Sequence, residues 1–384
     1  MRILSVIESL TWGGAERLLV YILPRLQSRG HVCEVAALFP PYFVAPALEE
    51  SGIVVHRLNL AHRLNMVAAI AKIATLCHQG KFDILHGNLF YAVMYTAMSR
   101  PFATAQRRVV SFHNCDYDRY PSDTPLKRAR KATHKWLMRH WIDGWAAVSQ
   151  EVARHYQAHF GLQGIRVIYN AFPLDTLRPV AGLDVAAVRA RYGVSAADFL
   201  LVTPARFVRH KGQRFALQAL TLLRERGLRP KLLLLGQGPS AGQLSDMVKE
   251  LGLQEQVIAH DPVPHGEVLR LIQAADALVL ASLNEGFGIA AGEAMALEKP
   301  VLATRVEGLK ELVEEGVSGL LVPPADPVAL AEGIESLMCD PALRERLGRA
   351  GRERIETHFS ADAVAGQWEK FYRSLLDDRG PPKA

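Results

Sequence analysis

The chain has 384 residues, of which 49% are hydrophobic and 22% charged, and its formal net charge at pH 7 is +6. This length exceeds what one hydrophobic core usually supports, so we expect two domains of roughly 150 to 200 residues. The composition excludes a disordered or fibrous protein, and no apolar run approaches the roughly 18 residues that cross a bilayer. We therefore expect a globular protein that is cytoplasmic or peripheral on the inner face of a membrane.

The cysteines and the charge distribution narrow the class of protein further. Four cysteines lie far apart, without the Cys-x-x-Cys spacing of a zinc site, which favours reduced thiols in a cytoplasm. Residues 1–175 carry 20 Lys and Arg against 12 Asp and Glu, a net charge of +8, whereas the remainder carries −2. The basic first half predicts an acidic partner for that half.

Along the first half, short apolar runs alternate with longer segments of helical spacing. The predicted strands are RILSVI, CEVAAL, VVHRL, DILHGN and RVVSFH, and AERLLVYILPRLQSRG is a predicted helix. This alternation is typical of a parallel sheet with helices on both faces. The Pro-rich stretch FPLDTLRPVAGLD, at 172–184, follows and is the best linker candidate.

The second half repeats the alternation. Its predicted strands are FLLVTPA, PKLLLLG, QVIAHD, ALVLAS, PVLAT and GLLVP. The predicted fold class is therefore α/β, with two tandem Rossmann-like, doubly wound domains at 1–172 and 185–358 that bind ligands at the carboxyl ends of their strands. The last helical segment, 360–378, comes after the second sheet is complete and is expected to cross back onto the first domain.

The segment NEGFGIAAGEAMALEKP, at 284–300, contains Glu285 and Glu293. A glycosidase pair is disfavoured, because their spacing in a helix corresponds to roughly 12 Å and hydrolytic carboxyls lie roughly 5 to 9.5 Å apart. The Gly-rich turn at 286–288 instead offers backbone N–H groups to a phosphate or a sugar hydroxyl. Glu285 would accept hydrogen bonds from sugar hydroxyls, and Glu293 from a ribose diol. The alternative is an N-cap partner at Glu285 and a solvated helix residue at Glu293.

Short motifs follow one another in a fixed order along nearly the whole chain. They are Gly13-Gly14-Ala15-Glu16, the strand end WAAVS at 145–149, Arg206 with Lys211-Gly212, the turn LGQGP at 235–239, and the E-x7-E run that starts at Glu285. Together they resemble the retaining glycosyltransferases of family four. The resemblance implies the GT-B architecture, in which two Rossmann-like domains face a cleft and a C-terminal helix returns to the first domain.

The resemblance implies a nucleoside-diphosphate sugar, linked to UDP or GDP, as the donor, and a sugar, glycolipid or lipid-linked acceptor. It assigns Arg206 and Lys211 to the donor pyrophosphate, where breaking the anomeric bond leaves negative charge. Arg206 would bind by its planar fork and Lys211 as a point charge. The alternative is a pair of exposed loop cations.

The same resemblance implies further site residues. His113, at the strand end in VVSFHNCD, would contact the donor sugar near the reacting centre, unless it is only a satisfied histidine at a strand end. Glu285 belongs with Arg206, Lys211 and His113 in the catalytic set. The nucleobase would lie against the backbone near Val257 and Ile258. The remaining donor-binding positions implied by the motifs are Gly13, Gly14, Gly236, Gly286, Phe287, Gly288, Ile289 and Glu293.

No Asp-x-Asp motif follows a predicted strand, and DYD at 116–118 does not fit that pattern. Two fixed cations make a metal unnecessary, so we expect no metal site and no other cofactor. Retention at the anomeric carbon is implied by the resemblance, with the departing phosphate accepting the proton of the acceptor hydroxyl. Ala171, Ala205 and Glu307 depart from the family pattern, and Glu307, beside the expected sugar and phosphate pocket, would either select an unusual sugar or weaken donor binding.

The segment 126–140, LKRARKATHKWLMRH, concentrates positive charge in the first half. One interpretation is an amphipathic helix that lies on anionic lipid and presents a lipid-linked acceptor. The other is a solvated basic helix whose apolar side covers the first sheet. No RNA- or DNA-binding motif accompanies the charge, so a nucleic-acid partner is not expected.

The leading hypothesis is a retaining, metal-independent glycosyltransferase in cell-surface polysaccharide or glycolipid assembly. A nucleotide-sugar 2-epimerase on the same two-domain fold is one alternative, and it would need no acceptor. A non-catalytic nucleotide-sugar binding protein is the other, and it would never turn the donor over.

Overall fold

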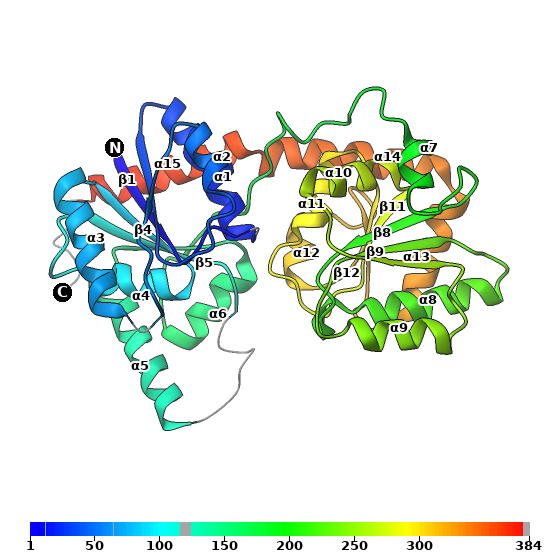
Figure 1. The fold of residues 1–384 in the computed structure, drawn as a ribbon, viewed down its shortest axis with the longest axis horizontal. Coiled ribbons are helices and arrows are strands. Elements are labelled where there is room, and N and C mark those ends of the chain that lie inside the picture. Colours follow the sequence, from blue (N-terminus) through cyan, green and yellow to red (C-terminus); the bar gives the residue numbers. More distant parts are fainter. Residues whose placement is uncertain (12, 64, 116–123, 379–384) are drawn as a thin grey trace. The chain divides into compact units, whose positions relative to one another are not determined.

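The computed structural model describes residues 1–11, 13–63, 65–115 and 124–378. The chain divides into two compact units: unit 1 is Met1–Ala171 with Ala361–Ala384, and unit 2 is Phe172–Ser360. Each unit contains a parallel sheet with helices packed around it (Figure 1). This arrangement confirms the predicted α/β class with two doubly wound domains.

The sheet of unit 1 has seven strands in the order β3-β2-β1-β4-β5-β6-β7. The strands are β1 (Arg2–Ile7), β2 (Val32–Ala37), β3 (Val54–Arg57), β4 (Ile84–Asn88), β5 (Arg107–Phe112), β6 (Gly144–Ala147) and β7 (Arg166–Val167). The helices between them are α1 (Gly14–Ser28), α2 (Ala45–Glu50), α3 (Met66–Gly80), α4 (Phe90–Met98), α5 (Pro125–His140) and α6 (Gln150–Phe160). β1 is buried from Ile3 to Ile7 because helices cover both of its faces.

The sheet of unit 2 has six strands in the order β10-β9-β8-β11-β12-β13. They are β8 (Leu200–Pro204), β9 (Lys231–Leu235), β10 (Val257–His260), β11 (Ala277–Leu280), β12 (Val301–Thr304) and β13 (Leu320–Val322). The helices are α7 (Val185–Ala190), α8 (Gln213–Glu225), α9 (Ala241–Glu250), α10 (His265–Ala274), α11 (Ile289–Ala296), α12 (Glu307–Leu312), α13 (Pro327–Cys339) and α14 (Pro341–Arg354), with a 3-10 turn η1 (Arg209–Lys211) and a π-helical turn η2 (Ile355–Phe359).

The last helix, α15 (Ala361–Asp377), belongs to unit 1 and packs along α1. Its Trp368 and Tyr372 are 2% exposed and lie in the core of that unit. Glu369 forms ion pairs with Arg29 and Arg373, and the hydrogen bond from Arg373 is the largest cause that lowers the pKa of this carboxyl to about 2. The predicted return of the C-terminal helix to the first domain is confirmed.

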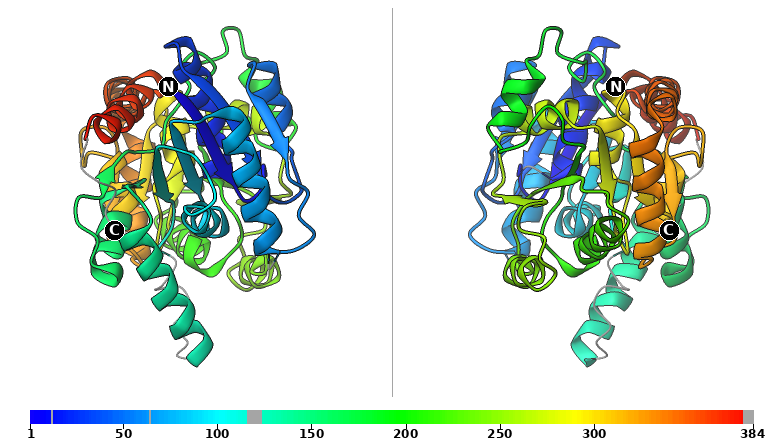
Figure 2. Two further views of the ribbon diagram at one scale, coloured as in Figure 1. Left: turned by 90° about the vertical axis from the view of Figure 1, so that its left-hand side faces the viewer. Right: turned by 90° about the vertical axis from the view of Figure 1, so that its right-hand side faces the viewer.

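Helix α5 projects from the rest of unit 1 in each view (Figure 2). His134, Leu137 and Met138 are buried on its inner side, whereas Trp136 is 49% exposed. Among the described residues, no helix has both the length and the apolar character needed to span a bilayer.

Candidate functional site

The site in unit 2 lies where the order of the strands changes direction. β8 and β11 pair in parallel, but the chain leaves β8 toward β9 on one side and leaves β11 toward β12 on the other. Doubly wound sheets bind ligands beyond the carboxyl ends of their strands at such a switch point. Arg206 follows the end of β8, and Glu285 follows the end of β11, so both predicted residues come to this edge.

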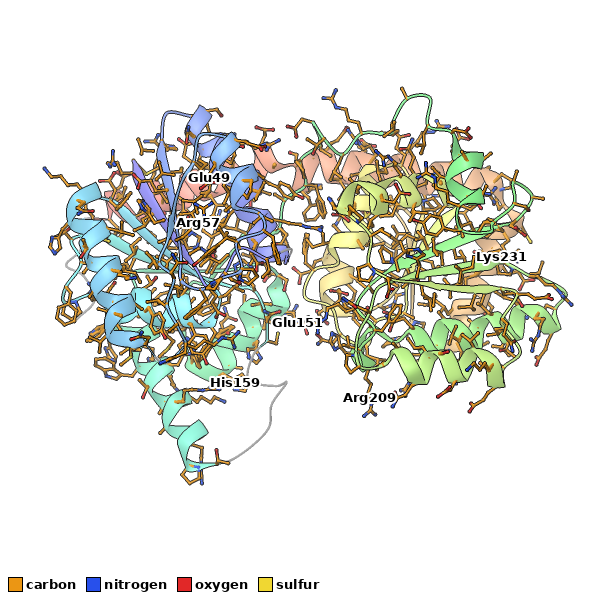
Figure 3. All side chains as sticks on the ribbon, viewed as in Figure 1. Glu49, Arg57, Glu151, His159, Arg209 and Lys231 are labelled. Atoms are coloured by element: carbon orange, nitrogen blue, oxygen red, sulfur yellow. The ribbon has the colours of Figure 1, made fainter. Side chains whose placement is uncertain are left out.

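Arg206 is an exposed cation at this edge. Its side chain makes no hydrogen bond or ion pair with any residue that the structure describes. The Arg206 backbone carbonyl accepts a hydrogen bond from Gln213 Nε2 at 2.9 Å, which holds the loop while leaving the guanidinium available. Such a group is suited to bidentate binding of a phosphate. Arg209, in the same loop, is also exposed and points away from unit 2 (Figure 3).

Lys211 and Glu285 form an ion pair, although 74 positions separate them in the sequence. Both side chains are largely buried, with 20% and 14% of their surface exposed. Ser282 Oγ donates a further hydrogen bond to Glu285 Oε2 at 3.3 Å. The resemblance assigns both residues to the site, but no sequence pattern predicts their ion pair. Because their charges neutralise one another, any anion that approaches Lys211 has to share it with Glu285.

The backbone brings these two residues together through Gly212. This glycine has φ of +64°, and a Cβ there would lie 1.9 Å from the carbonyl oxygen of Ala281 at the end of β11. The Leu283 N–H also donates to the carbonyl of His210 at 2.8 Å. Only glycine fits at 212, so the Lys-Gly motif is explained by the contact between the two loops.

The turn at 286–288 leads into α11. Gly288 is the N-cap residue with φ of +93°, and the first amides of α11 have no acceptor within the helix. The Phe287 side chain is 3% exposed and packs on Phe172 and Phe359. A ligand here would therefore meet the backbone of the turn and of Ile289 rather than the Phe287 ring.

The first turn of α12 packs against the Glu285 loop. A Cβ at Gly308 would lie 2.3 Å from the Glu285 carbonyl oxygen, so this position has to be glycine. The adjacent Glu307 forms an ion pair with Lys310 at 2.5 Å, and 35% of its side-chain surface is exposed. The expectation that Glu307 alters donor choice stays a prediction.

Glu293 is not a solvated helix residue, because it is only 4% exposed. His265, the first residue of α10, places its Nε2 2.7 Å from Glu293 Oε1. The alternative reading of Glu293 as a surface residue is therefore wrong. Sequence reasoning missed His265, because nothing in HDPVPH distinguishes it from a loop histidine.

The structure does not bring Val257 to the same edge. In the register of the sheet, Val257 is level with Leu232 and Leu201, at the amino end, whereas His260 is level with Pro204 at the carboxyl end. Ile258 is one residue further along β10 than Val257. A nucleobase over the carboxyl edge would meet His260 and Asp261 first, and contact with Val257 and Ile258 stays a prediction.

Gly236 does lie beside the Arg206 loop. Its φ is +156°, and a Cβ there would lie 2.2 Å from the carbonyl oxygen of Ala205. The Gly236 N–H donates to the His260 carbonyl at 3.0 Å. The LGQGP turn therefore crosses closely over Ala205, the residue before Arg206. This close approach is possible only because Gly236 has no side chain.

In unit 1, His113 follows β5 and lines a pocket of about 190 Å³. Its Nε2 lies 3.4 Å from Asn88 Oδ1 at the end of β4. Burial lowers the pKa of His113 to about 4, so the ring is neutral at physiological pH. The pocket is lined by Glu8, Leu89, Phe90, Val93, Ser111, Phe112, His113, Asn114, His134 and Tyr156.

The Gly13-Gly14 turn has a packing role. Gly13 is the N-cap residue of α1, and a Cβ there would lie 2.3 Å from Glu16 Oε2. Thr11 Oγ1 donates to Glu16 Oε1 at 2.6 Å, and Glu16 is 5% exposed. The Glu16 carboxylate already faces the helix N-terminus and competes there with a phosphate. Donor binding at Gly13 and Gly14 stays a prediction.

No group of three or more His, Cys, Asp and Glu side chains is placed to hold a metal ion in the part of the chain that the structure describes. The DYD sequence at 116–118 lies outside the described residues. Metal independence stays a prediction that needs a chelator experiment.

Two family models match the chain in succession. The model described as Glycosyltransferase Family 4 matches residues 12–176, and the model described as Glycosyl transferases group 1 matches residues 184–354. The chain is 30% identical over 300 residues to the D-inositol 3-phosphate glycosyltransferase of an Arthrobacter species, covering 74% of this chain and 69% of the relative.

A second relative is the putative glycosyltransferase EpsD of Bacillus subtilis, 30% identical over 203 residues, which is 53% of this chain and 52% of EpsD. The chain thus spans about half the length of that relative. Among solved structures, Anabaena HepE in complex with UDP-glucose superposes with a TM-score of 0.83 at 23% identity, covering 97% of this chain and 100% of HepE. That likeness establishes the same fold for the two chains.

Proposed function

Since this chain belongs to family 4 of the glycosyltransferases, we propose that it transfers a sugar from a UDP- or GDP-linked donor to an acceptor hydroxyl, with retention of configuration and without a metal. The Anabaena structure, whose ligand is UDP-glucose, supports a nucleotide-sugar donor. In this proposal the edge of unit 2 that carries Arg206 binds the donor diphosphate, and the His113 pocket of unit 1 contacts the sugar.

One observation carries the proposal: at the switch point of unit 2 stands an exposed guanidinium that is unpaired among the residues the structure describes. Arg206 stands beyond β8 in the same loop as Lys211, whose ion pair with Glu285 joins this loop to the one after β11. A diphosphate bound at this edge gains a bidentate contact with Arg206 and a point charge from Lys211. These cations stabilise the charge that develops on the leaving diphosphate, which is a transition-state interaction.

The chemical step breaks the bond between the anomeric carbon and the donor phosphate oxygen, and the electron pair stays on that oxygen. The acceptor oxygen forms the new bond to the anomeric carbon from the same face. Its proton moves to the departing phosphate oxygen, so the protein does not have to supply a base. Positioning and fixed charge are then the main contributions of the chain.

The two glutamates hold hydroxyl groups in this proposal. Glu285 keeps one oxygen in contact with Lys211 and Ser282, and it accepts a hydrogen bond from a hydroxyl of the transferred sugar. Glu293, buried and bonded to His265, accepts from the ribose diol. Neither carboxylate acts as an acid or a base.

We place the acceptor in cell-surface polysaccharide or glycolipid assembly, with α5 as the segment that contacts an anionic membrane. Arg128, Arg130 and Arg139 are exposed on this projecting helix, and Trp136 offers an apolar contact. Lipid-linked acceptors would then reach the protein by diffusion in the membrane plane.

The reaction is tested with UDP-, GDP- and ADP-linked sugars in EDTA, with and without glycolipid and lipid-linked acceptors. We expect UDP or GDP release that depends on an acceptor, and NMR of the product should show the donor's anomeric configuration. Release of an epimerised sugar without acceptor would favour the 2-epimerase. Binding without turnover would favour a binding protein, and activity restored only by Mg²⁺ or Mn²⁺ would contradict metal independence.

Arg206→Ala and Glu285→Ala should each lower turnover by at least ~10²-fold, or about 2.7 kcal/mol of transition-state stabilisation. Arg229→Ala is the matched control, because Arg229 is an exposed arginine before β9, at the opposite edge of the same sheet. Near-normal rates in both site variants would remove these residues from the site.

A further inference from the structure

A buried amide at the end of β4 controls the surroundings of His113. Asn88 is 1% exposed, and its Nδ2 lies 3.4 Å from the Val6 carbonyl oxygen and 3.3 Å from the His86 carbonyl oxygen. Both carbonyls accept from this nitrogen, so the amide cannot be turned over without losing both contacts. Asn88 Oδ1 therefore faces His113 Nε2, at 3.4 Å.

This orientation determines which nitrogen of His113 carries the hydrogen. An amide oxygen only accepts hydrogen bonds, so His113 Nε2 has to donate. Burial lowers the pKa of His113 to about 4, and a neutral imidazole has a single N–H. With that hydrogen on Nε2, Nδ1 carries a lone pair.

The neighbouring histidine is fixed in a similar way by α15. His86 is 3% exposed, with Tyr372 Oη 2.8 Å from its Nδ1 and Ser111 Oγ 2.6 Å from its Nε2. The phenol is the stronger donor, so Nε2–H of His86 donates to Ser111. Ser111 lines the same pocket as His113. The chain of hydrogen bonds from Tyr372 thus holds β4 and β5 together beneath the pocket.

We propose that Asn88 is a positioning residue that keeps His113 in its Nε2–H tautomer, so that His113 Nδ1 accepts a hydrogen bond from a sugar hydroxyl in the pocket. This inference rests on the proposed function, because it takes the pocket to hold a sugar. The side chain then recognises an uncharged hydroxyl group, and it neither donates a proton to the leaving group nor pairs with an anion.

The experiment uses the full chain labelled with ¹⁵N-histidine. Long-range ¹H–¹⁵N spectra distinguish the two neutral tautomers and the charged ring, and the His113 signals are assigned by their loss in His113→Gln. We expect the Nε2–H tautomer for wild type at pH 7. Asn88→Leu should give a mixed population, because leucine offers no acceptor to Nε2.

Kinetics with a set of monodeoxy donors and acceptors adds a functional readout. The deoxy substrate that lacks the hydroxyl bound by Nδ1 should lose roughly tenfold in kcat/KM with wild type, and this penalty should disappear in Asn88→Leu. Ser5→Ala is the matched control: Ser5 is fully buried on β1, level with His86 in the sheet, and its hydroxyl has no partner among the described residues. Ser5→Ala should keep the wild-type tautomer of His113 and the wild-type loss in kcat/KM with the deoxy substrate.

A wild-type His113 in the Nδ1–H or the charged form would overturn the proposal, and so would an unchanged tautomer and penalty in Asn88→Leu. If that variant does not fold, the wild-type spectrum still decides between the tautomers. The spectra need no turnover. An inactive wild type with the expected tautomer would therefore count against the proposed function, and an active wild type with the wrong tautomer would count against this inference alone.

Discussion

Single residues in unit 2 shape the site through close backbone contacts. Gly212, Gly236 and Gly308 each lie where a Cβ would meet a carbonyl oxygen at 1.9, 2.2 and 2.3 Å respectively. These carbonyls belong to Ala281, Ala205 and Glu285, which border the carboxyl edge of β8 and β11. Because these three glycines have no side chain, the loops can pack closely. This packing sets the positions of Arg206, Lys211 and Glu285.

His265 provides a prediction at this scale. His265→Ala removes the 2.7 Å contact to the buried Glu293 carboxylate and so disturbs its orientation. If Glu293 holds the donor ribose, the donor KM should rise roughly tenfold with little change in kcat, because the ribose is remote from the reacting bond. Initial-rate kinetics over a donor series measures both constants.

Arg270→Ala on the same helix is the control, since 52% of the Arg270 side chain is exposed and its ion pair is with Glu267, not with Glu293. It should leave the donor KM unchanged. A fall in kcat at constant KM in His265→Ala would place His265 and Glu293 near the reacting centre instead of the ribose.

Motif order in the sequence predicted where Arg206, Lys211 and Glu285 fall along the chain, but not their contacts. The Lys211–Glu285 pair joins residues of two different loops, which no local pattern encodes. The burial of Glu293 did have a signal: the run IAAGEAMA is apolar on all sides except at that glutamate, which is typical of a buried helix.

At the scale of elements, helix α5 has features of both interpretations of the basic segment. Its inner side is buried against unit 1, as the solvated-helix interpretation requires, and Trp136 remains exposed beside the arginines. Arg128, Lys135 and Arg139 recur at helical spacing, so they share one face. The side chains of Leu126 and Lys127 lie outside the described residues.

The membrane proposal predicts that wild type sediments with vesicles that contain anionic phospholipid, and less so at high salt. Replacement of Arg128 and Arg139 by Glu should reduce the bound fraction several-fold, because each basic residue near the surface contributes about 1 kcal/mol. Arg349→Glu should leave the bound fraction unchanged, because Arg349 lies on α14, with 68% of its side chain exposed. Equal binding to neutral vesicles, or no effect of the double variant, would leave α5 as a solvated helix.

Strands and helices were predictable because each sheet is buried on both faces and its strands are short apolar runs. The predicted helix at 15–30 even continues through Pro24, as α1 does in the structure. The docking of α15 depends on contacts of Glu369 with Arg29 and His31, more than 300 positions away in the chain. Its place could be expected from the resemblance but not from periodicity.

At the scale of the whole molecule, unit 1 contains three histidines whose pKa is strongly lowered by burial. In unit 1, burial lowers the pKa of His86 and His134 to about 3 and that of His113 to about 4. In an unfolded chain a histidine has a pKa of about 6.5. Between about pH 6.5 and 4 the unfolded state therefore binds more protons, so the free energy of unfolding of unit 1 falls as the pH falls.

The expected slope approaches about 1.4 kcal/mol per pH unit for each of these histidines. Tryptophan fluorescence during urea unfolding measures it, because all five tryptophans belong to unit 1. His134 packs against the rings of Phe90 and Phe160, so His134→Phe keeps a ring of similar shape at this position. The variant should lower the slope by the contribution of about one histidine. A slope that is flat, or equal in this variant, would contradict the burial of neutral histidines.

The central claim is that fixed cations, without a metal, bind the donor diphosphate at the switch point of unit 2. Calorimetric titration with UDP and GDP in EDTA tests it most directly. The account predicts that wild type binds one of them in EDTA and that Arg206→Ala raises its Kd at least ~10-fold, or about 1.4 kcal/mol. Binding only after Mg²⁺ or Mn²⁺ is added, or an unchanged Kd in Arg206→Ala, would contradict it.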